Sequence, residues 1–208
     1  MEKKLINVAL ILSIITIVYN FGEGIVSIIF GIDDQTLALS GFGVDSFVEV
    51  VSGIGIFHMI LRIKNSSSIN RDKFESTALK ITGYAFYLLT AGLVFGSIIN
   101  IIEQNKPDTT FAGIIISIIS IFSMYFLMKS KLRVGRELKS DAIIADAHCT
   151  KTCFNLSIIL LISSLLYEIS SIGYFDILGS LGIAYYSFME GKESLEKAKD
   201  NELHCSCP

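Results

Sequence analysis

The chain has 208 residues, of which 51% are hydrophobic and only 18% are charged, and its formal net charge is -3. Soluble domains carry roughly 25% charged residues, so this composition is too apolar for a soluble globular protein and excludes intrinsic disorder and a disulfide scaffold. The near balance of acidic and basic residues also excludes a nucleic-acid-binding protein. The composition therefore predicts a small polytopic membrane protein with an all-α fold.

Six apolar segments follow one another along the chain, and each is about as long as a membrane-spanning helix. The first, third and fourth contain long uncharged runs, which are Leu5–Gly22, Ile81–Ile102 and Thr109–Met128. The first segment is too long for a signal peptide and no small-residue cleavage site follows it, so we predict a retained helix. The predicted transmembrane helices cover about residues 5–30, 36–63, 77–103, 109–129, 142–169 and 172–190. Residues 1–191 then form one transmembrane domain, and residues 192–208 form a short cytoplasmic tail.

The Lys and Arg residues predict the orientation of these helices, because cytoplasmic loops of membrane proteins are enriched in them. Basic residues gather at the start of the chain, between the second and third segments, in residues 129–139 and after the sixth segment. The three opposite loops hold a single basic residue, Lys106. Both termini should therefore face the cytoplasm, with residues 129–139 as a basic extension of the fourth helix. The compact size and the lack of a targeting segment favour a prokaryotic plasma (inner) membrane.

The second segment carries two carboxylates at membrane depth. Asp45 and Glu49 are four residues apart, so they share one face of the predicted helix. Burying a charge in the bilayer is costly, which makes an ionisable residue there a candidate for function. By itself the pair also has a structural interpretation, because a carboxylate in a span can be a hydrogen-bonded packing residue.

The fifth segment carries two thiols at the same spacing. Cys149 and Cys153 are four residues apart, and Asp146 lies three residues before Cys149 on the same stripe. The second and fifth helices run antiparallel, so Asp45 is expected level with Cys153 and Glu49 level with Cys149. Two carboxylates and two thiols match the ligand number of a tetrahedral divalent-ion site, and Zn²⁺ fits best, with Cd²⁺ as a toxic mimic. Cysteine is also a common small core residue, so a packing role for the thiols stays open.

Several other polar residues are weaker candidates. Glu23 in the first segment either lines the outward path or makes a helix-helix contact, and Asp146 is a candidate inner-gate residue. His58 is expected at the membrane interface, and Asp176 is expected to cap the sixth helix. The tail ends in a candidate set for soft-metal capture, which is His204, Cys205 and Cys207. A dispensable reduced tail is the alternative.

Glycines in the second and sixth segments have a simpler interpretation. Small residues let membrane helices approach closely. We predict this packing role, without any ligand function, for Gly41, Gly43, Gly53, Gly55, Gly179 and Gly182.

The paired motifs resemble those of the cation diffusion facilitator (cation efflux) family. Residues 45–49, Asp-Ser-Phe-Val-Glu, resemble the family's D-x-x-x-D signature, and residues 140–147 leading to Cys149 and Cys153 are similar to the opening of its fifth span. The span count, the orientation and the basic fourth-to-fifth loop match as well. The resemblance implies a proton-coupled divalent-cation exporter in the lipid bilayer, not an enzyme, with Asp45, Glu49, Cys149 and Cys153 as metal ligands between the second and fifth helices.

The sequence departs from the family pattern in two ways. Glu49 stands where the family has a second Asp, while Cys149 and Cys153 stand at its usual His and Asp. These changes concern the identity of the ion more than the activity, so Fe²⁺, Co²⁺ and Mn²⁺ stay alternatives beside Zn²⁺ and Cd²⁺. The family usually carries a ferredoxin-like cytoplasmic domain, for which the tail is too short, so a homodimer is expected to form through the membrane helices.

The mechanistic hypothesis is an exchange of metal for protons. Carboxyl and thiol groups in an apolar environment favour their neutral forms, and metal binding requires them to lose their protons. The same four groups can therefore hold either a dication or protons. Cytosolic metal would enter, displace protons and leave outward while protons return.

Two rival functions belong to other classes. A membrane thiol redox protein would use Cys149 and Cys153 as a redox pair, but C-x-x-x-C is not the C-x-x-C spacing of dithiol oxidoreductases. It would also leave Asp45 and Glu49 without a role. A non-transporting scaffold would use all of these polar residues for packing alone.

Overall fold

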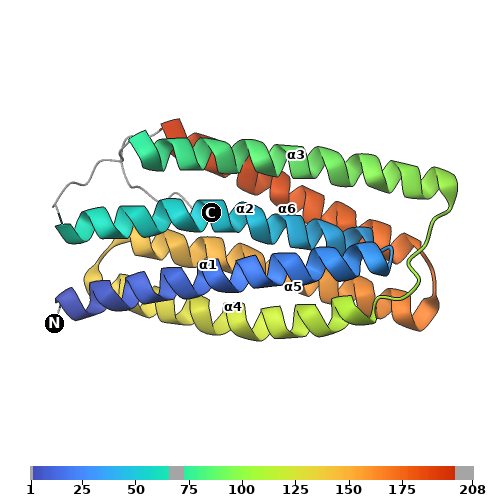
Figure 1. Ribbon diagram of the computed structural model, residues 1–208, viewed down its shortest axis with the longest axis horizontal. Helices are drawn as coiled ribbons and strands as arrows, with labels where there is room; N and C mark the ends of the chain where they lie inside the picture. The colour runs from blue at the N-terminus through green and yellow to red at the C-terminus, as the bar shows by residue number, and fades with distance from the viewer. Residues whose placement is uncertain (1, 66–72, 200–208) are drawn as a thin grey trace.

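The computed structural model describes residues 2–65 and 73–199, which fold into six α-helices (Figure 1). The prediction of an all-α protein is confirmed. The helices are α1 (Glu2–Asp33), α2 (Leu37–Asn65), α3 (Lys73–Glu103), α4 (Phe111–Leu138), α5 (Asp141–Ser170) and α6 (Tyr174–Lys199). Each predicted segment corresponds to one helix, and α4 continues through the basic residues as expected.

Helices α1 to α5 are long and apolar enough to cross a membrane. Helix α6 does not reach that hydropathy, so its role as a sixth span stays a prediction. It nevertheless packs along the whole bundle with α3, α5 and α2. Residues 192–199, which we assigned to the tail, continue α6. The tail candidates His204, Cys205 and Cys207 lie outside the described residues.

The helices alternate in direction and form one elongated bundle (Figure 1). The most extensive contacts join α1 to α2, α3 to α6 and α4 to α5. Helix α2 also contacts α5, so the predicted neighbours are neighbours. The start of α1 and the end of α6 lie at one end of the bundle, which we call the inner end after the predicted orientation. The opposite end, with the α1–α2, α3–α4 and α5–α6 connections, is the outer end.

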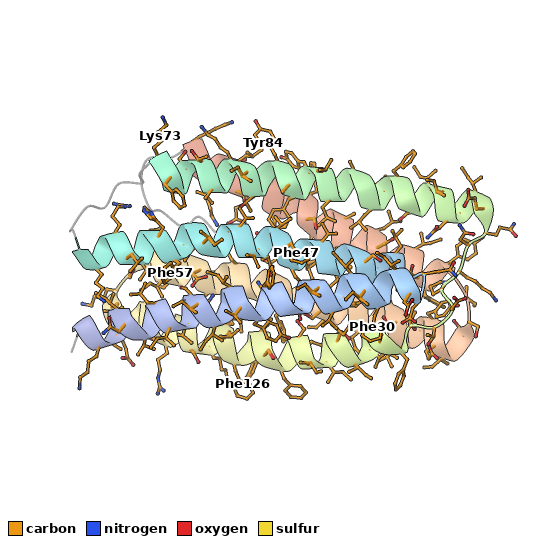
Figure 2. All side chains as sticks on the ribbon, viewed as in Figure 1. Phe30, Phe47, Phe57, Lys73, Tyr84 and Phe126 are labelled. Atoms are coloured by element: carbon orange, nitrogen blue, oxygen red, sulfur yellow. The ribbon has the colours of Figure 1, made fainter. Side chains whose placement is uncertain are left out.

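The surface of the bundle is apolar, while many polar side chains point inward. Leu88, Phe95 and Phe126 are more than half exposed, whereas Asp45 and Asn20 are buried. Figure 2 shows Tyr84 and Phe126 pointing away from the helices. A soluble protein has the reverse distribution, so this surface is the one expected against lipid.

Glycines allow a close approach between α1 and α2. A Cβ added at Gly43 would lie 2.8 Å from Ile28 Cγ1 and 2.9 Å from the Ile28 backbone nitrogen. One added at Gly24 would lie 3.1 Å from the carbonyl oxygen of Gly43. The packing role predicted for Gly43 is therefore confirmed.

The outer end is closed by carboxylates that cap helices other than their own. Asp176 accepts hydrogen bonds from the backbone nitrogens of Leu37 at 3.0 Å and Ala38 at 3.2 Å. The prediction that Asp176 caps α6 is wrong, because its side chain turns across the bundle to the N-terminus of α2. Glu168 at the end of α5 similarly accepts a hydrogen bond from the Thr110 nitrogen at the start of α4, at 3.0 Å.

Candidate metal-binding site

Glu49 is the point at which three helices meet. The thiol of Cys153 on α5 donates a hydrogen bond to Glu49 Oε1 over 2.5 Å. The side-chain amide of Asn20 on α1 donates to Glu49 Oε2 over 2.9 Å. Both carboxylate oxygens are thus occupied by side chains from neighbouring helices, which fix the position of the carboxylate. Because Cys153 is buried, this contact lies inside the bundle.

Asp45 lies on the same face of α2, one turn toward the outer end. It is buried, and its Oδ1 accepts a hydrogen bond from Ser187 of α6 at 3.3 Å. We expected Asp45 level with Cys153, but Glu49 occupies that level. The expected register was wrong by about one helical turn, because the spacing within each helix does not determine how far two helices slide along each other.

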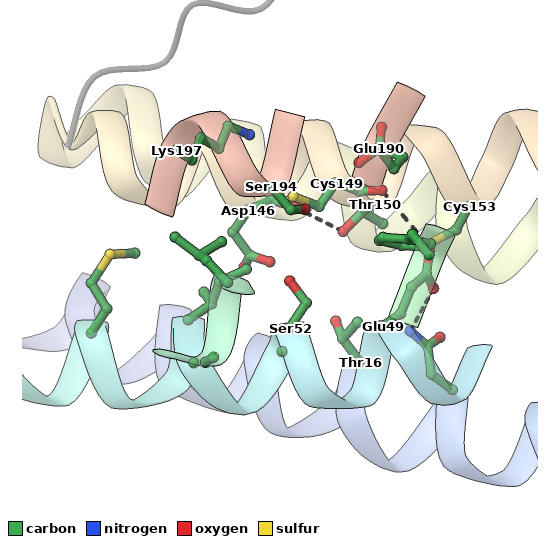
Figure 3. Close-up of a pocket in the computed structure, with 18 of the residues that line it drawn as sticks. Thr16, Glu49, Ser52, Asp146, Cys149, Thr150, Cys153, Glu190, Ser194 and Lys197 are labelled. Carbon is green, nitrogen blue, oxygen red and sulfur yellow. Dashed lines mark hydrogen bonds between the residues drawn. The ribbon is translucent and has the colours of Figure 1, made fainter. Parts of the chain in front are cut away.

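A cavity of about 80 Å³ extends from Glu49 and Cys153 toward the inner end (Figure 3). This volume is enough for an ion with several waters. All six helices contribute to its lining, chiefly the second halves of α2 and α6 and the first halves of α3 and α5. Its polar lining consists of Thr16, Asn20, Glu49, Ser52, Lys131, Asp146, Cys149, Thr150, Cys153, Glu190, Ser194 and Lys197.

Cys149 lies in the cavity wall one turn from Cys153, toward the inner end. It is half-buried, and both thiols are free of disulfides. Across the cavity, Glu190 of α6 accepts a hydrogen bond from Thr152 at 2.7 Å. The cavity therefore presents thiol and carboxylate groups from three helices.

The structure brings only part of the predicted ligand set together. Glu49 touches Cys153 and shares the cavity with Cys149, while Asp45 does not line that cavity. Within residues 2–65 and 73–199, no three side chains of His, Cys, Asp or Glu are placed to hold a metal ion jointly. The joint action of all four groups stays a prediction.

Comparison with known proteins identifies the family of this chain. A protein-family model, the cation efflux transmembrane domain, matches residues 9–200. The chain belongs to the cation efflux family. Cation efflux proteins transport metal cations across membranes and are not enzymes. Membership of the family therefore indicates an integral membrane protein that exports metal cations. A search of curated proteins found no match.

In this cation efflux protein, Glu23 is buried between α1 and α2. It accepts hydrogen bonds from Tyr19 at 3.0 Å and from Ser46 at 3.2 Å. The Ser46 contact supports the helix-contact alternative for Glu23. It does not line the inner cavity, and its place on an outward path stays a prediction.

Among the residues of the cation efflux cavity that sequence reasoning missed are Asn20, Glu190 and Lys131. Asn20 and Glu190 were not singled out, although an amide within an apolar run and a carboxylate at the end of a span are visible signals. Lys131 was counted among the basic loop residues that predict the orientation of the helices in the membrane. It is instead buried and pairs with Asp146 of α5, which a run of basic residues does not reveal.

His58 lies near the inner end of α2 and packs against Phe74, with ring centroids 4.6 Å apart. It does not line the cavity. The interfacial role that we predicted for His58 stays a prediction.

Proposed function

We propose that this cation efflux protein is a proton-coupled exporter of divalent metal ions, with Zn²⁺ as its preferred substrate. The observation that carries the proposal is the contact between the Cys153 thiol and the Glu49 carboxylate at the end of a polar cavity. One thiol and one carboxylate on facing helices, with Cys149 one turn away, offer Zn²⁺ sulfur and oxygen ligands that it accepts. Cd²⁺ should compete, because thiolates favour soft ions.

The same contact supports proton coupling. Cys153 donates its proton to a hydrogen bond with Glu49. A dication can bind both groups only after that proton leaves, because a metal ligand must be deprotonated. Metal loading and proton release are then one event at one pair of side chains, and returning protons can expel the metal.

The cavity supports a direction for the ion. It extends from Glu49 toward the inner end, and the predicted orientation puts that end in the cytoplasm. Asp45 lies one turn farther outward, where Ser187 holds it. A cytosolic ion would therefore meet Cys149 first, then Glu49 and Cys153, and would engage Asp45 when α2 and α6 move apart. A prokaryotic plasma membrane fits this direction.

The test is metal uptake into proteoliposomes with an imposed pH gradient, comparing Zn²⁺, Cd²⁺, Mn²⁺, Fe²⁺ and Co²⁺. Wild type should transport Zn²⁺ in a gradient-dependent manner. Glu49→Gln and Cys153→Ala should each lower the rate at least about 100-fold, because each removes a ligand. Glu137→Gln is the matched control, since Glu137 is an exposed residue of α4, and it should transport normally.

Two results would contradict the proposal. Normal Zn²⁺ transport by Cys153→Ala would remove the thiol from the mechanism. Absence of flux for every metal in folded wild-type protein would favour the redox or scaffold functions instead. Size-exclusion chromatography and circular dichroism before reconstitution establish that each variant is folded.

A further inference from the structure

A buried ion pair lies in the wall of the cavity, between α4 and α5. Lys131 Nζ is 2.8 Å from Asp146 Oδ1, and the two side chains are only 1% and 7% exposed. The ammonium also donates a hydrogen bond to Thr150 Oγ1 at 3.0 Å. Thr150 in turn donates to the Asp146 carbonyl oxygen at 3.1 Å. The lysine is thus held by two partners that belong to the same helix.

Such a pair needs a reason beyond stability. Taking two charges out of water costs free energy that their attraction often fails to recover, and apolar side chains of similar size can join two helices equally well. Both residues also line the cavity. The pair therefore lies beside the route that the proposed function gives to the metal ion.

The position of Asp146 explains what the ammonium prevents. Asp146 precedes Cys149 by three residues, so both lie on one face of α5. An unpaired carboxylate beside that thiol would offer a dication two ligands before it reached Glu49, with Glu190 across the same cavity. An ion bound there would be held short of the transport pair.

We propose that Lys131 neutralises Asp146 so that the inner part of the cavity passes metal ions without trapping them. This inference rests on the proposed function. The ammonium cancels the charge of Asp146, so a dication in the inner cavity is attracted less strongly than it would be beside an unpaired carboxylate. The transport pair then remains the tightest binding position along the route.

The proposal predicts effects of opposite sign for the two single charge deletions. Lys131→Met exposes Asp146 to the ion, so the KM for Zn²⁺ should fall at least about tenfold, with a matching fall in the maximal rate as the ion is retained. Asp146→Asn leaves the ammonium unpaired, so the KM should rise at least about tenfold. Lys131→Arg keeps the charge and should stay close to wild type.

The measurements are transport kinetics in proteoliposomes and Zn²⁺ binding to the purified full-length protein by isothermal titration calorimetry. The double variant Lys131→Met with Asp146→Asn removes both charges and leaves no buried ion unpaired. It should return the KM to within about threefold of wild type, because two residues in contact are coupled and removing both charges leaves neither one unpaired. If Lys131→Met fails to fold, Asp146→Asn and the double variant still test the sign and the compensation.

A merely structural role for the pair gives a different result. Both single variants would then lose maximal rate with an unchanged KM and unchanged Zn²⁺ affinity, which would overturn the inference while wild-type transport stands. Absence of Zn²⁺ flux in folded wild type would instead contradict the proposed function. The two failures are therefore distinguishable within one set of vesicles.

Discussion

The outer and inner halves of the bundle use the same six helices and differ in how they are filled. In the outer half, Leu39, Phe42 and Leu160 form a fully buried apolar core, and Asp176 ties the start of α2 to α6. In the inner half, an apolar cluster around Ile60 packs α1, α2, α4 and α5 together, and beside it polar side chains surround a cavity that begins at Glu49. The two halves therefore differ chiefly in the polar cavity, which lies on the inner side of Glu49.

This difference places the polar cavity on the inner side of Glu49 and the apolar core of Leu39 and Phe42 on its outer side. Alternating access would require the outer contacts to open and the inner cavity to collapse. Hydrogen bonds of Asp176 and Glu168 join helices at the outer end, whereas the Glu49 contacts and the Lys131–Asp146 pair join helices around the cavity. Single substitutions in each half of the bundle can test this difference.

The largest expected effect concerns access of water-soluble reagents to thiols in the two halves. A protein with Cys149 as its single thiol should react with a small methanethiosulfonate reagent at least about 100-fold faster than one with a single thiol introduced by Ser97→Cys. Ser97 is fully buried in the outer half and bonds Ser180 at 2.8 Å, so its reaction requires local opening. Mass spectrometry of the labelled protein over time measures both rates. Equal rates would mean that both halves are open to water.

The next effect concerns the outer closure. Asp176→Ala leaves the backbone nitrogens of Leu37 and Ala38 without their carboxylate partner, so the free energy of unfolding should fall by about 1–3 kcal/mol. Unfolding in mixed detergent micelles, followed by circular dichroism, measures the change. Asp108→Ala is the control, because Asp108 is exposed and bonds the exposed side chain of Gln35. A control variant destabilised as much as Asp176→Ala would argue against a special role for the buried cap.

The smallest effect concerns the contact between α1 and α2 beside the carboxylates. Gly43→Ala places a methyl group against Ile28, so the free energy of unfolding should fall by about 1 kcal/mol. Gly22→Ala is matched to it, because nothing lies within 4 Å of the added carbon. That variant should gain about 0.5–1 kcal/mol from the better helix propensity of alanine. The same unfolding measurement decides the sign, and a stabilised Gly43→Ala would show that the helices can separate without cost.

Much of the fold could be predicted from the sequence because its signals are local. The apolar runs predict where the helices lie, and their lengths follow from the thickness of a bilayer. The spacing of Asp45 with Glu49, and of Cys149 with Cys153, places each pair on one helical face. The paired motifs also predicted the cation efflux family, which the match over residues 9–200 shows.

The sequence alone therefore determined which residues share a helix face, because that depends on their spacing along the chain. It also determined which helices are apolar, because that depends on the transfer of their side chains out of water. Only the tertiary structure decided the register that joins Glu49 to Cys153, the turn of Asp176 toward α2 and the burial of Lys131 against Asp146. Each of these depends on how two helices slide and rotate against each other. That choice is made by the packing of all six helices together, and residue spacing within one helix carries no information about it.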